Sequence, residues 1–170
     1  MPTRNPTCLS PAHPGDAGVE ELNLDERERA VLAAARHYLA GFANPSGHAW
    51  MRVVLGSRDF FPAANHAEIA QAVLRMVQAV RVSRRSVLRF SNPHCACCVR
   101  VLTAQERNLM LMVREARAGS AAAATHAMLL CEGNETAHLL ASVRGLVTLL
   151  DGAARGPANL GPAGNDGCRA

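Results

Sequence analysis

Four side chains that can bind a soft metal or carry out thiol chemistry lie within one short segment. They are His94, Cys95, Cys97 and Cys98. The thiolate form of cysteine is both the nucleophile and the metal ligand, and imidazole often completes zinc sites. A cluster this dense predicts either metal binding or redox sensing.

The spacing of the cluster predicts an incomplete metal site. Zinc takes four ligands in a tetrahedron. In extended backbone, successive side chains point to opposite sides, so Cys95 and Cys97 would share one side and His94 and Cys98 the other. The segment alone then supplies two or three ligands. We expect the others to come from elsewhere in the chain, and the candidates are Cys131, His126, His66 and His48.

Three interpretations of these thiols remain open. The first is a metal ion, with zinc as a structural ion that fastens the segment to the rest of the fold, or Cu(I) at a low-coordinate site. The second is a thiol redox sensor, because a disulfide between Cys97 and Cys98, or between Cys95 and Cys97, would be strained and readily reduced. The third is that the thiols are small, half-buried apolar side chains.

Positive charge is concentrated around the cluster. All 18 basic residues are arginine, which is typical of a GC-rich genome and predicts a bacterial origin. Residues 75–117 hold nine arginines against two glutamates, whereas residues 1–30 have an excess of acids. A basic segment attracts anions and favours thiolates. Four arginines are candidates for contacts with nucleic acid, although the same residues suit the negative end of a helix: Arg81, Arg84, Arg85 and Arg89.

Sequence motifs for catalysis are absent. The chain contains no G-x-S-x-G, P-loop, G-x-G-x-x-G or H-E-x-x-H motif. A nucleophile pair such as Cys95 with His126 stays open, because such pairs meet in space and not in sequence. The sequence favours a non-enzymatic, metal-binding regulatory or adaptor protein with a structural zinc ion and a protein partner. The alternatives are a thiol redox sensor and a regulator that binds nucleic acid.

The sequence predicts a cytoplasmic protein that does not enter membranes. No apolar run reaches the ~18 residues that a membrane span requires. The first residues also lack the apolar stretch of a secretory signal.

Apolar side chains recur at helical spacing through the middle of the chain, which predicts an all-α fold. We expect five or six helices in one compact, bundle-like domain over residues 23–151, between disordered tails at 1–22 and 152–170. No repeat of 20 to 50 residues is visible. The expected helices cover residues 25–42, 46–56, 65–83, 104–118, 120–131 and 134–151.

Local signals mark several helix ends and suggest which helix is central. Ser46 is the expected N-cap of helix 46–56. Thr103 with Glu106 forms a capping box, and Gly119 is suited to end the same helix. Met110 and Met112 lie in a nearly continuous apolar run there, which favours a core helix over a partner surface.

The cysteine cluster lies on the one long segment without helical periodicity, residues 84–101. Ser86 to Phe90 has the composition of a short extended piece, but a single strand cannot form a sheet. Irregular loops of about 15 residues within a compact domain are uncommon and are often functional. The loop leads directly into the strongly capped helix, which we expect to hold the cluster in place.

Overall fold

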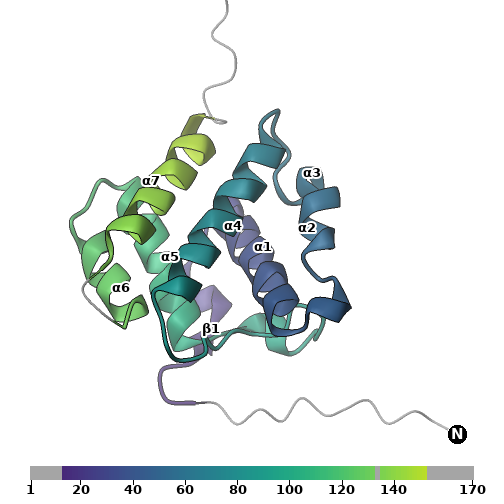
Figure 1. Cartoon of the computed structure of the whole chain (residues 1–170), viewed down its shortest axis with the longest axis horizontal. Helices are drawn as coiled ribbons and strands as arrows, with labels where there is room; N and C mark the ends of the chain where they lie inside the picture. Colours follow the sequence, from purple (N-terminus) through teal and green to yellow (C-terminus); the bar gives the residue numbers. More distant parts are fainter. Residues whose placement is uncertain (1–12, 133–134, 153–170) are drawn as a thin grey trace, which may run out of the picture.

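A computed structural model describes residues 13–132 and 135–152 and confirms the predicted all-α class (Figure 1). Its seven α-helices are joined by short 3-10 turns and one antiparallel pair of two-residue strands. The helices are α1 (Glu26–Ala43), α2 (Met51–Leu55), α3 (Ser57–Phe60), α4 (His66–Val82), α5 (Ala104–Arg117), α6 (Ala122–Leu130) and α7 (Ala137–Gly152).

The first strand and 3-10 turn precede the predicted boundary at Asn23. Residues 17–22 form strand β1 (Ala17–Gly18) and the 3-10 turn η1 (Val19–Leu22). Strand β1 pairs with β2 (Val101–Leu102), so the predicted tail supplies the strand partner that the sequence did not reveal. Residues 86–90 are not a strand. The remainder of the predicted tails, residues 1–12 and 153–170, lies outside the described residues.

The expected helix over 46–56 is wrong. The chain instead forms the 3-10 turn η2 (Pro45–Gly47), then α2 and α3. His48 takes a left-handed conformation with φ of 50°, which separates Ser46 from the helix, and Trp50 becomes the N-cap of α2. The start expected at Asn134 lies outside the described residues.

Capping signals fix both ends of α5 as predicted. The Thr103 hydroxyl accepts the Glu106 backbone N–H, and the Glu106 carboxylate accepts the Thr103 N–H. At the other end Gly119 has a φ of 67°. The backbone N–H groups of Gly119 and Ser120 return to the Ala116 and Glu115 carbonyls, which closes the helix in a Schellman arrangement.

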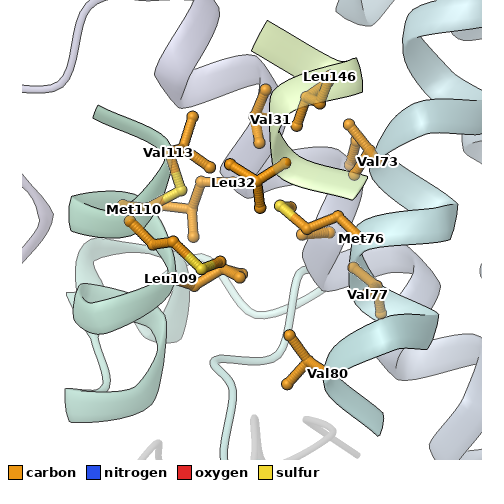
Figure 2. Packing of buried hydrophobic residues seen from close by; sticks show 14 of the residues in the cluster. Val31, Leu32, Val73, Met76, Val77, Val80, Leu109, Met110, Val113 and Leu146 are labelled. Atoms are coloured by element: carbon orange, nitrogen blue, oxygen red, sulfur yellow. The ribbon is translucent and has the colours of Figure 1, made fainter. Parts of the chain in front are cut away.

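The core lies where α1, α4, α5 and α7 meet, as Figure 2 shows. Met110 and Met112 are fully buried, which confirms the prediction that α5 is a core helix. Burial of each large apolar side chain favours folding by roughly 1.5–3 kcal/mol. The labelled members are Val31, Leu32, Val73, Met76, Val77, Val80, Leu109, Met110, Val113 and Leu146.

The two halves of the described chain repeat one order of elements. Residues 17–82 run from a strand to a long helix, two short helices and a second long helix, and residues 101–152 run from a strand to a long helix, the single shorter helix α6 and a second long helix. Strands β1 and β2 pair antiparallel, with Ala17 opposite Leu102 and Gly18 opposite Val101. The two halves therefore meet along their first strands.

The second long helices of the two halves, α4 and α7, bury side chains at matching positions. The four buried residues of α7 have the same spacing as four of the eight buried residues of α4, and the two helices pack together. The matched positions lie 70 residues apart in the sequence, and only the spacing of a few residues is kept while the connecting segments differ. The matched core positions are Ile69, Val73, Met76 and Val80 in α4, and Leu139, Val143, Leu146 and Leu150 in α7.

Reciprocal ion pairs join the long first helices of the halves. Each capping-box glutamate, Glu28 in α1 and Glu106 in α5, is followed eight positions later by an arginine. Arg36 pairs with Glu106 at 2.7 Å, and Arg114 pairs with Glu28 at 2.8 Å. Because each helix start meets a later position of the other helix, α1 and α5 run antiparallel.

Glu106 is the most heavily used of these carboxylates and is almost completely buried. Oε1 accepts from Arg36 Nε at 2.7 Å and from the Ser91 N–H at 3.0 Å. Oε2 accepts from Arg36 Nη2 at 3.1 Å and from the Thr103 N–H at 2.9 Å. Arg36 also donates to the carbonyls of Val99 and Val101, at 2.8 and 2.6 Å. This ion pair therefore ties the irregular loop to α1 and α5.

We predict that Glu106→Gln lowers the free energy of unfolding by about 3–5 kcal/mol, because it leaves the buried Arg36 guanidinium without a counter-charge. Denaturant titration followed by circular dichroism measures the change. Glu68→Gln, at an exposed position of α4, is the control and should change stability by less than about 1 kcal/mol. Equal stabilities of the two variants would contradict the role of Glu106.

Candidate functional site

The backbone of the cysteine cluster is a helical turn and not an extended strand. Cys97 has φ and ψ of −80° and −46°, and residues Cys98–Arg100 form the 3-10 turn η3. The Val99 N–H donates to the Cys95 carbonyl at 3.0 Å, and the Arg100 N–H donates to the Cys97 carbonyl at 3.3 Å. The expectation of alternating side chains is therefore wrong.

Helical backbone brings together side chains three positions apart, and here it pairs Cys95 with Cys98. The Cys98 thiol contacts the Cys95 sulfur, with 2.8 Å between the two Sγ atoms. The Cys98 backbone N–H also donates to the Cys95 sulfur at 3.4 Å. Both residues are half-buried, whereas Cys97 is exposed. The C-x-x-C spacing of Cys95 and Cys98 was visible in the sequence and could have identified this pair.

His94 belongs to a second pair that sequence reasoning missed. Its ring lies edge-on to that of His37 in α1, with 5.2 Å between ring centroids, and Phe60 contacts His37 from another side. His37 is only 7% exposed. Its Nδ1 has no hydrogen-bond partner among the described residues. The pairing depends on the fold, because 57 positions separate the two histidines and no spacing rule connects them.

Burial, together with electrostatic repulsion from His94 and Arg52, lowers the pKa of His37 to about 4. The neutral imidazole is therefore the folded form at physiological pH. An imidazole held neutral beside the loop adds no charge to the thiol pair.

The other metal-ligand candidates are engaged elsewhere. His126 Nδ1 lies 3.2 Å from the Asn108 side-chain oxygen. Cys131 is buried at the end of α6, where it lines a cavity with Glu132 and His138. Within residues 13–132 and 135–152, no three His, Cys, Asp or Glu side chains are grouped to hold a metal ion. The structure thus brings together two of the predicted ligands, Cys95 and Cys98.

The candidate nucleic-acid arginines make contacts within the chain. Arg81 lies over the Phe42 ring, 3.8 Å from its centroid. Arg84 donates to the Leu130 carbonyl and pairs with Glu132.

The two remaining arginines of this group differ: Arg89 forms an ion pair through its side chain, whereas Arg85 is exposed and is held through its backbone. Arg89 pairs with Asp16 at 2.9 Å. The Arg85 backbone N–H donates to Glu132 at 2.7 Å. Hydrogen bonds from the Ser86 side chain and from the Ser86 and Arg85 backbone lower the pKa of Glu132 to about 2. The basic segment therefore fastens α4 to the end of α6 and to the first strand.

Comparison with protein-family models, with curated proteins and with solved structures found no match to this chain. Among the described residues, no helix combines the length and apolar character needed to cross a membrane.

We predict that stability falls as pH decreases from 6.5 to about 4. The folded state keeps His37 neutral over this range, whereas the unfolded chain binds a proton at the ordinary pKa of 6.5. Stability is therefore full above pH 6.5, and this one group removes up to about 1.4 kcal/mol per pH unit below it. His37→Phe keeps a ring in place and removes the titration. Denaturant midpoints at several pH values should depend less on pH in this variant, and an unchanged slope would contradict the prediction.

Proposed function

We propose that Cys95 and Cys98 form a reversible dithiol–disulfide couple and that the protein is a non-enzymatic thiol redox sensor. The observation that carries this proposal is the 2.8 Å separation of the two sulfurs within a C-x-x-C turn. A disulfide is ~2.05 Å long, so small side-chain rotations suffice to form the bond. Cytoplasmic thiols are kept reduced, and oxidation there is a signal; we place the protein in that compartment.

The two cysteines have different roles in this proposal. The Cys95 sulfur accepts both the thiol and the backbone N–H of Cys98, and such donors stabilise a thiolate. Cys95 therefore attacks a peroxide: its sulfur bonds to one oxygen, the O–O bond breaks, and the leaving oxygen takes a proton. The product is a sulfenic acid on Cys95. Cys98 then attacks that sulfur, the S–O bond breaks and water leaves, so two thiols are oxidised while one peroxide is reduced.

The oxidation state of Cys95 and Cys98 is coupled to the buried ion pair between Arg36 and Glu106. Directly after Cys98, the carbonyls of Val99 and Val101 accept hydrogen bonds from the buried Arg36. Closure of the disulfide repositions the start of η3, and the change passes to the loop that α1 and α5 hold. A regulated protein partner, or a nucleic acid, would respond to that loop.

Zinc is the second candidate ligand of the same pair, because C-x-x-C is also the usual spacing of two zinc ligands on one turn. The described residues supply no third ligand. Zinc bound in this way would need ligands from outside the described residues. A redox couple therefore suits Cys95 and Cys98 better than a zinc site does.

We predict that hydrogen peroxide converts Cys95 and Cys98 to an intramolecular disulfide that a dithiol reductant reverses. Trypsin cleavage after Arg89 and Arg100 places both residues in one peptide, which should lose two hydrogen atoms by mass spectrometry. Cys97→Ser is the matched control and should still form the bond. Cys95→Ser and Cys98→Ser should not.

Two results would overturn this function. One is loss of the disulfide in Cys97→Ser, which would assign the bond to Cys97. The other is about one zinc ion per chain by elemental analysis, with the metal lost in Cys95→Ser and the thiols resistant to peroxide. The second result would support the metal-binding alternative.

A further inference from the structure

Four large apolar side chains are exposed on α2 and its N-cap. Trp50, Met51, Val54 and Leu55 are 41, 38, 47 and 77% exposed, while Val53 of the same helix is fully buried. At 100° per residue these four positions cover one continuous face of about 140°. An apolar face gathered within six consecutive residues is typical of a contact surface, whereas single exposed apolar residues are ordinary. We call these four residues the α2 face.

The α2 face is built on a rigid support. Trp50 lies so close to Gly41 of α1 that a Cβ added there would come within 3.0 to 3.2 Å of its side chain and backbone N. Val53 anchors the opposite side of the helix in the core. In Figure 1, α2 and α3 lie at the edge of the molecule away from α6. A preformed surface of this kind loses little conformational freedom when a partner binds.

Charge around the α2 face favours an acidic partner. Arg52 lies within α2 and Arg58 follows Leu55 by three residues in α3; both are exposed and form no ion pair within the described part of the chain. Asp59 is the one acid next to them. A two-fold contact between copies of this chain would bring identical arginine-bordered faces together. Recognition of anionic membranes usually takes clusters of roughly four to eight basic residues, more than are present here.

We propose that the α2 face is the docking site for an amphipathic helix of a protein partner, with an apolar stripe that covers Trp50 and Leu55 and carboxylates that meet Arg52 and Arg58. Trp and Arg are the residues most enriched at energetic centres of interfaces. The proposal is independent of the thiol chemistry, since none of these residues belongs to the cysteine loop.

The test uses the tryptophan already present. Trp50 is the only tryptophan in the chain, so its fluorescence reports directly on the α2 face. The full-length protein is titrated with a synthetic helical peptide that carries leucines at helical spacing and glutamates beside them. A saturable blue shift of the emission is expected, and added salt should weaken it. A peptide with lysine in place of each glutamate should bind at least tenfold more weakly.

Matched variants distinguish specific binding at the α2 face from nonspecific binding to other exposed apolar side chains. Leu55→Asp and Val54→Asp should each weaken binding about tenfold or more without loss of helical circular dichroism. Leu129→Asp changes a 61% exposed leucine on α6 and should bind like the unchanged protein. Sedimentation equilibrium tests whether a second copy of the chain binds the α2 face. Titration with phosphatidylserine vesicles tests whether an anionic membrane binds it.

Four outcomes would overturn the proposal. They are no saturable shift, equal binding of the lysine peptide, self-association that Leu55→Asp abolishes, and a shift with vesicles but not with the acidic peptide.

Discussion

The buried ion pair between Arg36 and Glu106 is the interaction on which the rest of the structure depends. Burial of two charges is costly unless the attraction between them and further hydrogen bonds compensate. Here every oxygen of Glu106 accepts two hydrogen bonds, and the Arg36 donors reach two backbone carbonyls as well. The pair thereby joins α1, α5 and the loop before α5 at one point. Its counterpart between Arg114 and Glu28 holds the same two helices at the other end.

This arrangement explains how an irregular loop can hold a chemical site. Residues 84–101 lack the apolar periodicity that packs a helix against a core. Apart from the buried Leu88, their positions depend on polar contacts, through Ser91, Val99 and Val101 to the ion pair and through β2 to β1. The cysteine turn lies between these anchor points. Because β1 belongs to the first half and β2 to the second, the candidate site lies where the two halves of the fold meet.

Much of the helical framework followed from local signals. The Thr103–Glu106 capping box, Gly119 and the apolar stripes of α1, α4, α5 and α7 predicted those helices to within a few residues. Short elements were harder, since α2 and α3 are too brief to show a period. Strand β1 was assigned to a tail because two residues carry no pattern. The cysteine pair was misread because an extended backbone was assumed, although the C-x-x-C spacing was present.

By itself, the sequence determined the all-α class, the long helices, the buried methionines of α5 and the segment where the chemistry lies. These properties depend on side-chain spacing and capping within about one or two turns, which the order of residues specifies directly. Only the tertiary structure decided which glutamate pairs with which arginine, and that His37 faces His94. Each of these contacts depends on how backbone segments far apart in the chain are placed in space. Long-range packing sets that placement, and no local spacing rule encodes it.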